Sequence, residues 1–498
     1  MTAALLVAGT TSDAGKSVVT TGLCRAFRRR GIRVAPYKAQ NMSNNSMVCR
    51  GGGEIGRAQW IQALAAGAEP EVAMNPVLLK PGGDRTSHVV VLGEPAGTVS
   101  SAGWSEERAP LARIAHEAFD DLAGRFELVV AEGAGSPTEI NLRESDFVNL
   151  GLARHAGIPA VVVGDIDRGG VFAAMYGTVA LLEAADQALI AGFVVNKFRG
   201  DRTLLEPGLD QLTRLTGRPT YGVLPWRADL WLDSEDALDL EGRRARADAT
   251  VPDVLRVAVV RLPRISNFTD VDALGIEPDV DVVFATSPRD LAGADLVVLP
   301  GTRATLADLG WLRTRGLDEA ITRHARAGGS VLGICGGAQM LGRTISDPPG
   351  VEGADGAHER GLGLLDLRTT FERDKVLGLP TGRGLGQPVD GYEIHHGRLE
   401  TGDLEPFPGG GRSEGVFATM WHGSLESDEF REAFLADVAA RAGLGRRASG
   451  VVFADRRELR LDLLGDLVEQ HLDVDALLDL AERGPAPGLP TLLPAPSR

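Results

Sequence analysis

Apolar runs alternate with helix-like spacing through the first half of the chain. Residues 3–8 form a continuous apolar run, which predicts a buried strand. Residues 17–30 carry apolar side chains at helical spacing, Gly31 supplies a helix stop, and residues 32–37 resemble the next strand. Further strands are expected at 128–131, 160–163 and 192–195. This repetition of strand, helix and strand predicts a parallel sheet covered by helices on both faces.

The pattern breaks once and then starts again. Residues 236–253 are densely charged and lack apolar periodicity, so we interpret them as a linker between two domains. A second alternating series follows, with strands expected at 254–261, 280–285, 296–299, 331–334 and 416–420. The predicted fold class is α/β, with two doubly wound domains over residues 1–235 and 254–483.

The end of the chain carries two further expectations. Residues 457–482 have the spacing of an amphipathic helix, which we expect to pack on the second domain. Residues 484–498 are rich in proline, and that composition favours a disordered tail.

Composition and charge narrow the functional classes. The chain of 498 residues is 43% hydrophobic and 24% charged, a balance typical of globular proteins. Its net charge of −16 argues against a nucleic-acid or anionic-membrane partner. Cys24, Cys49 and Cys335 are scattered without a paired motif, and no apolar run approaches the ~18 residues of a membrane span. We therefore expect a cytoplasmic protein in a reducing compartment.

A glycine-rich loop joins the first predicted strand to the first predicted helix. It reads Gly9-Thr10-Thr11-Ser12-Asp13-Ala14-Gly15-Lys16-Ser17. Small residues there let backbone N–H groups approach a phosphate, and the helix N-terminus adds partial positive charge. Lys16 would reach the β- and γ-phosphates of ATP, and the Ser17 hydroxyl would bind Mg²⁺. A surface turn is the plainer interpretation, but the position between a strand and a helix favours a nucleotide site.

The spacing of this loop departs from the ordinary phosphate-loop motif. That motif, GxxxxGK[ST], places a glycine where Thr10 stands, and here the glycine comes one residue earlier, at Gly9. This register resembles the loop of the dethiobiotin synthetase family. The resemblance implies that ATP is bound by Gly9, Thr10, Thr11, Asp13, Ala14, Gly15, Lys16 and Ser17.

Polar residues directly follow three other predicted strands of this half. Glu132 lies at the edge where ligands bind in open α/β sheets, and it resembles the Mg²⁺-binding glutamate of the same family. Asp165 and Asp167 could bind a metal or a nucleophile, or only cap the next helix. Asn196 stands where related ATPases bind adenine, although an ordinary turn fits almost as well.

A second strong motif reads Val331-Leu332-Gly333-Ile334-Cys335-Gly336-Gly337-Ala338-Gln339. It places Cys335 on a tight strand-to-helix turn, the arrangement of a nucleophile elbow. The helix N-terminus favours the thiolate, which can attack the side-chain amide of glutamine to give a thioester and ammonia. Gly336, and Gly301 after another strand, could donate the two N–H groups of an oxyanion hole. A buried structural thiol is the alternative, but the flanking glycines favour catalysis.

Cys335 needs a histidine as its base. His422 ends an expected strand late in the domain, the position of this histidine in class I glutamine amidotransferases. His395 and His396 are rivals, and we favour His422. Many relatives carry a glutamate two residues later to orient the histidine, but Ser424 stands there in this chain. The third member of the site is therefore left open.

Together, the two sites resemble the cobyrinic and cobyric acid amide synthases, over about residues 3–482. The segments 36–46, 163–170, 264–270 and 391–395 favour the member that amidates four carboxylates of cobyrinic acid a,c-diamide. The resemblance implies that ATP phosphorylates a corrin carboxylate and that ammonia from glutamine attacks the acyl phosphate. The candidates for corrin contact are Lys38, Gln40, Asn41, Asp165, Asp167 and His395.

Two alternatives stay open. The a,c-diamide synthase of the same family shares the architecture but has other carboxylate targets. A nucleotide-dependent switch like the partition ATPases, with an inactive glutaminase domain, is the alternative from another class, and the intact motif around Cys335 argues against it. In an amidating enzyme, ammonia must pass between the two sites away from water, because protonation removes its lone pair.

Overall fold

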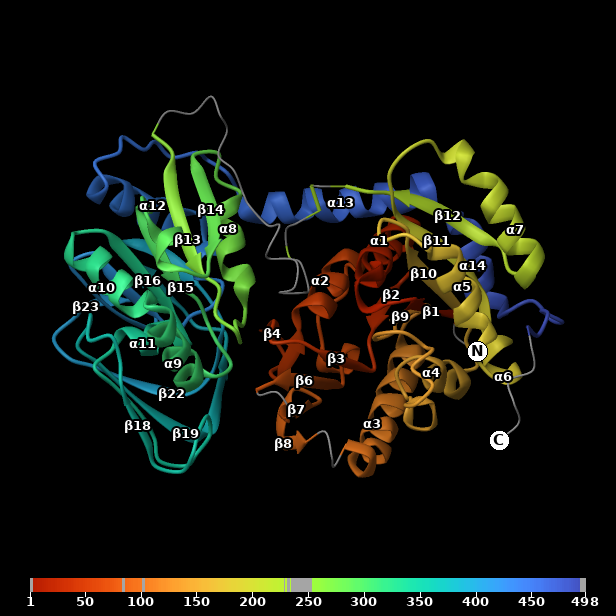
Figure 1. Ribbon diagram of the computed structural model, residues 1–498, viewed down its shortest axis with the longest axis horizontal. Helices are drawn as coiled ribbons and strands as arrows, with labels where there is room; N and C mark the ends of the chain where they lie inside the picture. Colours follow the sequence, from red (N-terminus) through yellow and green to blue (C-terminus); the bar gives the residue numbers. More distant parts are fainter. Residues whose placement is uncertain are drawn as a thin grey trace.

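The computed structural model describes residues 3–82, 86–100, 104–227, 229–230, 233 and 253–492. These form two lobes side by side, with one long helix running across the top of both (Figure 1). The expected linker, 236–253, lies outside the described residues apart from Asp253.

The first lobe is built on a six-stranded parallel sheet in the order β12-β11-β10-β1-β9-β2. Its strands are β1 (Ala3–Gly9), β2 (Val34–Tyr37), β9 (Leu128–Glu132), β10 (Ala160–Asp165), β11 (Ile190–Phe198) and β12 (Thr220–Pro225). The strands predicted for this half are therefore present. Alternate side chains of β1 enter different cores, Leu5 and Val7 on one face and Leu6 and Ala8 on the other, as the two-residue period of a strand requires.

Helices cover both faces of this sheet. The chain forms α1 (Lys16–Arg29), α2 (Arg57–Ala66), α3 (Trp104–Arg125), α4 (Leu150–Ala156), α5 (Val171–Ala180), α6 (Ala184–Gln187) and α7 (Glu206–Thr216). Phe27 of α1 packs with Leu5, whereas Phe119 of α3 and Met175 of α5 pack with Leu6. The doubly wound fold predicted for the first half is thus confirmed.

A small sheet of the first lobe faces the second lobe. Its strands are β3 (Gln40–Met42), β6 (Val77–Pro81), β7 (Thr86–Val91) and β8 (Glu94–Ser100), next to a ribbon of β4 (Ser46–Val48) and β5 (Glu54–Gly56). The Ser46 backbone N–H donates to Asn267 Oδ1 of the second lobe at 3.0 Å, so the ribbon forms part of the contact between lobes.

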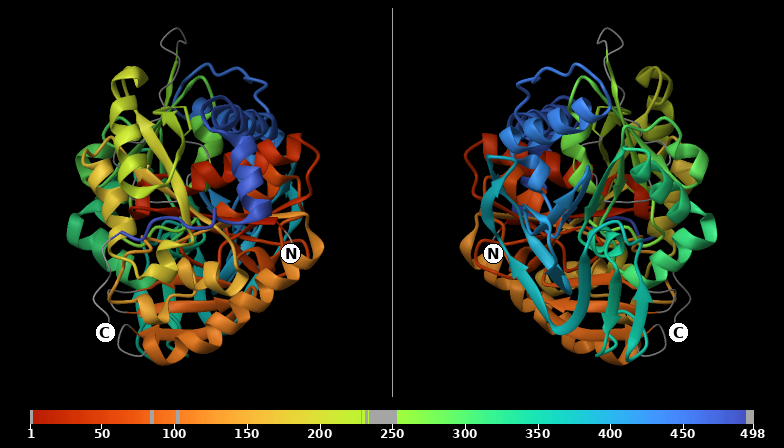
Figure 2. Two further views of the ribbon diagram at one scale, coloured as in Figure 1. Left: turned by 90° about the vertical axis from the view of Figure 1, so that its right-hand side faces the viewer. Right: turned by 90° about the vertical axis from the view of Figure 1, so that its left-hand side faces the viewer.

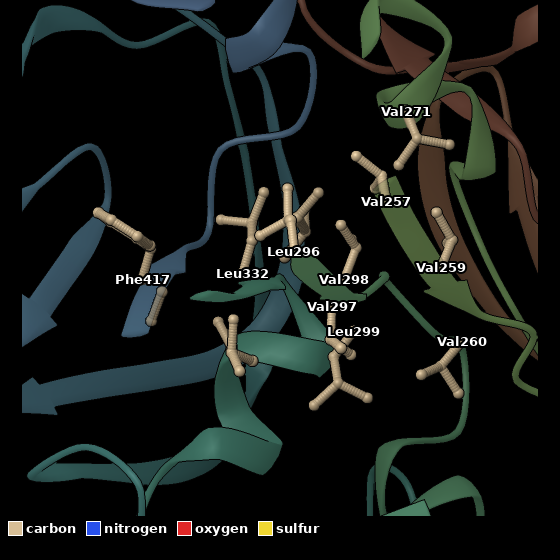
Figure 3. Close-up of a cluster of buried hydrophobic side chains, with 14 of the residues drawn as sticks. Val257, Val259, Val260, Val271, Leu296, Val297, Val298, Leu299, Leu332 and Phe417 are labelled. Carbon is tan, nitrogen blue, oxygen red and sulfur yellow. The ribbon is translucent and has the colours of Figure 1, made fainter. Parts of the chain in front are cut away.

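The second lobe carries a seven-stranded sheet in the order β14-β13-β15-β16-β25-β24-β23. Its strands are β13 (Leu255–Val260), β14 (Val280–Ala285), β15 (Leu296–Leu299), β16 (Ser330–Ile334), β23 (Glu405–Phe407), β24 (Gly410–Ser413) and β25 (Val416–Thr419). The first five in this order are parallel, and β24 and β23 add an antiparallel edge. Figure 3 shows Val257, Leu296, Leu332 and Phe417 of these strands in the core.

Helices and a second small sheet complete this lobe. The helices are α8 (Asp272–Gly275), α9 (Thr305–Arg315), α10 (Leu317–Arg326), α11 (Gly336–Leu341) and α12 (Asp428–Arg441). The small sheet has the order β18-β17-β19-β22, from β17 (Thr344–Asp347), β18 (Ala357–Arg360), β19 (Leu367–Gly378) and β22 (Glu393–Thr401). Between β19 and β22, the chain forms a hairpin of β20 (Thr381–Gly384) and β21 (Gln387–Asp390).

We predicted that residues 457–482 pack on the second domain, and this prediction was wrong. They form two helices, α13 (Phe453–His471) and α14 (Val474–Arg483), whose apolar faces join the core of the first lobe. Leu461 and Leu477 pack in the same core as Leu23, and Arg25 of α1 pairs with Asp462 at 2.8 Å. Figure 2 shows α13 near α1, with α3 well apart. Periodicity specifies an apolar face but not the surface that buries it.

The disorder predicted for 484–498 was also wrong as far as Leu492, where the described chain ends. The Leu492 backbone exchanges two hydrogen bonds with the Gln187 side chain, at 2.7 and 2.9 Å. The Pro490 carbonyl accepts one from Arg218 at 3.0 Å. Proline removes a backbone donor but leaves the carbonyl as an acceptor, so this proline-rich segment can still be fixed by side chains. The rest of the expected tail, 493–498, lies outside the described residues.

Among the residues that the structure describes, no helix combines the length and the apolar character that crossing a bilayer requires.

Candidate active sites

The glycine-rich loop turns tightly between β1 and α1. Gly15 has φ 96°, a left-handed conformation, and forms the N-cap of α1. A Cβ atom at Gly15 would lie 2.0 Å from Asn196 Nδ2, so only glycine fits there. Asn196 donates from this nitrogen to the Ala14 carbonyl at 2.9 Å. Asn196 therefore braces the loop from the end of β11.

Lys16 lies inside the loop that precedes it. Its Nζ donates to the carbonyl oxygens of Thr11 at 2.9 Å, Ser12 at 3.0 Å and Gly135 at 3.2 Å. The side chain is 4% exposed. A cradle of carbonyls satisfies the ammonium group here, and phosphate oxygens would replace these partners when a nucleotide binds.

Glu132 is the centre of the polar groups beside the loop. Its side chain is fully buried and accepts from Ser17 Oγ at 3.0 Å, Lys38 Nζ at 2.8 Å and Gln62 Nε2 at 2.6 Å. The pairing of Glu132 with Lys38 offsets the cost of burying a carboxylate. The sequence singled out Ser17, Lys38 and Glu132 separately, and the fold brings them together.

The same oxygens suit Mg²⁺. This ion prefers oxygen ligands and is usually held by one or two protein groups together with substrate phosphates and water. Ser17 Oγ and Glu132 Oε1 lie 3.0 Å apart, close enough to share one small ion. The residues present therefore fit an ion bound together with the nucleotide.

Asp165 and Asp167 lie at the end of β10, beside the loop. Asp165 accepts from Lys197 Nζ at 2.9 Å, and the same Nζ donates to the Asp13 carbonyl at 2.9 Å. Asp167 pairs with Arg199 at 2.9 Å and is more exposed. Neither caps α5, whose N-cap is Gly170. Asp165 thus supports the phosphate loop through a lysine.

The side chains of Gln40 and Asn41, which follow Lys38 in the chain, have different surroundings. Gln40 lines a pocket of about 90 Å³ with Arg108, Ser136 and Asn149, next to the loop whose Gly135 carbonyl contacts Lys16. Asn41 points elsewhere and donates to Gln59 Oε1 at 3.0 Å. A pocket of this size can admit a side-chain carboxylate but not a macrocycle.

In the second lobe, Cys335 has φ 51° and ψ −110°, a backbone conformation that is costly for any residue other than glycine. It stands between β16 and α11, and its N–H donates to the Thr419 carbonyl of β25 at 2.8 Å. A Cβ at Gly337 would lie 1.9 Å from the Leu299 carbonyl oxygen. The turn therefore contacts the backbone of β15 so closely that position 337 has no room for a side chain, which explains the glycine there.

His422 is fully buried next to Cys335. Its Nδ1 lies 2.7 Å from Asp270 Oδ2, and the Gly423 N–H donates to the other oxygen of Asp270 at 2.9 Å. Burial acts to lower the pKa of His422, but the charges of Asp270 and Cys335 and its hydrogen bonds to them raise it to about 10. The site is arranged as a cysteine–histidine pair in which an aspartate holds the imidazole.

Asp270 is the member of this site that the sequence did not reveal. It belongs to the 3-10 turn η6 (Phe268–Val271), 152 residues before His422. In the sequence, the segment 264–270 carries a family resemblance but indicates no chemical role for Asp270. The position two residues after the histidine is indeed not the acid: Ser424 begins another turn, η8 (Ser424–Glu426).

The loop after β15 closes on the same site. A Cβ at Gly301 would lie 3.0 Å from His422 Cε1, and one at Gly336 would lie 2.6 Å from Thr302 Cγ2. Gly301 thus packs against His422, and Gly336 packs against the loop that contains Gly301. They stay the proposed donors of the oxyanion hole.

A cavity of about 410 Å³ opens from this site towards the first lobe. Cys335 and His422 line it from the second lobe, and Lys80 and His88 line it from the first. His395 and His396 line it too, so His395 shares a cavity with the thiol, and no phosphate-loop residue is part of that lining. His395 Nδ1 contacts the Gly397 carbonyl at 2.8 Å, and its Nε2 lies 3.7 Å from Glu393 Oε1.

Comparisons with known proteins cover both lobes. A family described as the CobQ/CobB/MinD/ParA nucleotide binding domain matches residues 5–239, and one described as the CobB/CobQ-like glutamine amidotransferase domain matches residues 256–430. A cobyric acid synthase from Mycolicibacterium gilvum (strain PYR-GCK) is 69% identical over 495 residues, which are 98% of this chain and 99% of that protein. Another from Mycobacterium tuberculosis (strain ATCC 25177 / H37Ra) is 67% identical over 497 residues, with the same coverage.

A nucleotide-binding domain joined to a glutamine amidotransferase domain defines the class, a glutamine-hydrolysing ligase that forms amides. The identity to curated relatives covers 98% of the chain and therefore includes both domains. The chain belongs to the cobyric acid synthase family.

Proposed function

We propose that this protein uses ATP and glutamine to amidate four peripheral carboxylates of cobyrinic acid a,c-diamide, giving cobyric acid. The observation that carries the proposal is the pairing of a phosphate loop in one lobe with a Cys335–His422–Asp270 site in the other. The relatives' name supplies the corrin substrate. All three cysteines are unpaired thiols, which suits a reaction in the cytoplasm.

The second lobe would release ammonia from glutamine. Cys335 Sγ attacks the side-chain amide carbon, and the N–H groups of Gly301 and Gly336 would stabilise the oxyanion. His422 then gives its proton to the leaving nitrogen, so that the C–N bond breaks and a thioester and ammonia form. Water next hydrolyses the thioester to glutamate, with His422 as the base. Asp270 holds the imidazole in position throughout.

The first lobe would activate the carboxylate. The loop N–H groups and Lys16 hold the phosphates in line with a corrin carboxylate oxygen, which takes the γ-phosphoryl group while ADP leaves. Ser17 and Glu132 would hold Mg²⁺, which would offset the negative charge of the phosphates. Ammonia then attacks the acyl carbon, phosphate leaves, and the nitrogen loses a proton to give the amide.

Product mass tests the proposal. Purified protein is incubated with cobyrinic acid a,c-diamide, ATP, Mg²⁺ and glutamine, and the corrin is followed by mass spectrometry. We expect four successive acid-to-amide mass changes. A parallel incubation starts from cobyrinic acid, and its conversion at two positions only, with the a,c-diamide left unchanged, would identify an a,c-diamide synthase instead. ATP hydrolysis without any amide would favour the nucleotide-switch alternative.

A further inference from the structure

A row of buried amide side chains lies inside the first lobe, between the two proposed sites. It consists of Asn41 on β3 and Gln59 and Gln62 on α2, and we call these three residues the amide seam. Gln59 and Gln62 are fully buried and Asn41 is 3% exposed. Residues three apart on a helix share a face, so the two glutamines point the same way.

One end of the amide seam reaches the phosphate-loop site. Gln62 Nε2 donates to Glu132 Oε2 at 2.6 Å, and Glu132 Oε1 accepts from Ser17 Oγ at 3.0 Å. The Glu132 carboxylate therefore links Gln62 to the Ser17 hydroxyl, which we propose binds Mg²⁺.

The other end reaches the cavity that contains Cys335. Lys80 lines this cavity, and its Nζ donates to Ser46 Oγ at 3.0 Å. Ser46 faces Gly56 in the ribbon of β4 and β5. A Cβ at Gly56 would lie 2.8 Å from both Asn41 Nδ2 and Gln59 Oε1, so the missing side chain leaves room for the amide tips.

Several polar atoms along this path have no hydrogen-bond partner within the described parts of the chain. They are Gln59 Nε2, Gln62 Oε1 and the oxygen Oε1 of the neighbouring Gln40. A buried polar atom without a partner is costly, so a small polar guest beside these three atoms would stabilise them. Water and ammonia both fit, because each donates and accepts hydrogen bonds.

We propose that ammonia released at Cys335 travels along the amide seam to the acyl phosphate beside Glu132. The proposal rests on the function proposed above and names the residues that would carry the ammonia. Amides exchange hydrogen bonds with a neutral guest without donating a proton to it, so ammonia keeps the lone pair that it needs.

Charges at the cavity end favour the neutral form of the guest. Lys80 of the first lobe and Lys375 of the second both pair with the fully buried Glu54, and both line the cavity. Arg303 and Arg373 line the cavity as well, and Glu352 is the carboxylate in its lining, so cations outnumber carboxylates at this entrance. Such an entrance repels ammonium and admits ammonia.

The Gly56→Ala variant tests this path. Gly56 has φ −60°, so alanine fits the backbone, and the added methyl group meets only the tips of side chains. We measure glutamate released, amide formed from glutamine and amide formed from ammonium chloride. We expect glutamate release and ammonium-dependent synthesis near the wild-type rates. Glutamate per amide should rise about tenfold, the effect of ~1.4 kcal/mol on one barrier.

Gly177→Ala is the matched control, because a Cβ at this helical glycine of α5 meets nothing within 4 Å. Gln59→Leu is the second variant, which removes the amide without adding volume to the ribbon. An unchanged ratio of glutamate to amide in both variants would overturn the proposal. Equal losses with glutamine and with ammonium chloride would overturn it as well, because they would assign the seam to the acceptor site. Failure of the proposed function is distinguishable, since the wild type would then form no corrin amide.

Discussion

The two proposed sites differ in how they are assembled and in how ready they are for chemistry. The phosphate-loop site comes from one continuous loop and the ends of strands in one sheet, and its charged groups satisfy one another. The glutaminase site joins Asp270, Cys335 and His422 from distant segments, and it opens onto a cavity of about 410 Å³.

This difference indicates which site must change when ligands bind. Lys16 is bound to carbonyls of its own loop, and Lys38 is bound to Glu132, so a nucleotide has to displace these contacts. His422 is already aligned between Asp270 and Cys335. Ammonia is useful only when an acyl phosphate waits for it, so the second site depends on the first for its timing.

The largest expected effects separate the two sites by nitrogen source. Lys16→Ala should abolish synthesis from both glutamine and ammonium chloride, because phosphoryl transfer precedes either nucleophile. Cys335→Ala should abolish glutamine-dependent synthesis and glutamate release but leave ammonium-dependent synthesis. Amide formation with each nitrogen source, followed by mass spectrometry, measures both. If well-folded Cys335→Ala also lost the ammonium-dependent reaction, the division of labour between the lobes would be incorrect.

Asp270→Asn should weaken only the glutaminase site. An amide in place of the acid orients the imidazole in the wrong tautomer and removes the charge that supports its protonated form, so glutamate release should fall by about 10²–10⁴-fold. Ammonium-dependent synthesis should be retained. Asp403→Asn, at an exposed carboxylate, is the control for charge alone. Glutamate release in Asp270→Asn within about threefold of the wild type would contradict the role of this aspartate.

The contrast also explains what the sequence could predict. The phosphate loop and the elbow at Cys335 are local patterns, so their chemistry could be inferred from neighbouring residues. His422 could be found because few histidines end a strand late in the domain. Asp270 could not, because a carboxylate 152 residues away leaves no periodic signal at the histidine. The placement of α13 and α14 failed for the same reason, since an apolar face does not specify its partner.

The charge on His422 should make stability depend on pH. The pKa of His422 is raised from 6.5 to about 10 in the folded protein. Protonation therefore stabilises the fold fully below about pH 6.5, and this contribution is lost as the pH rises towards 10. Each pKa unit corresponds to about 1.4 kcal/mol. Urea unfolding of wild type and His422→Asn between pH 6.5 and 10 measures it, and the wild type should lose more stability over this range. Parallel pH profiles would mean that His422 is neutral when folded.

The smallest expected effect is at Ser424, two residues after His422. Its side chain is 4% exposed, but it lies in the turn after Gly423, and the imidazole already has Asp270 as its acid. Ser424→Ala should therefore change the rate of glutamate release by less than about threefold, or under ~1 kcal/mol. The turnover number at saturating glutamine is the measurement, with Asp270→Asn as the reference for a lost acid. A loss of about 10²-fold or more would show that the hydroxyl helps to orient the imidazole, and the site would then share its support between Ser424 and Asp270.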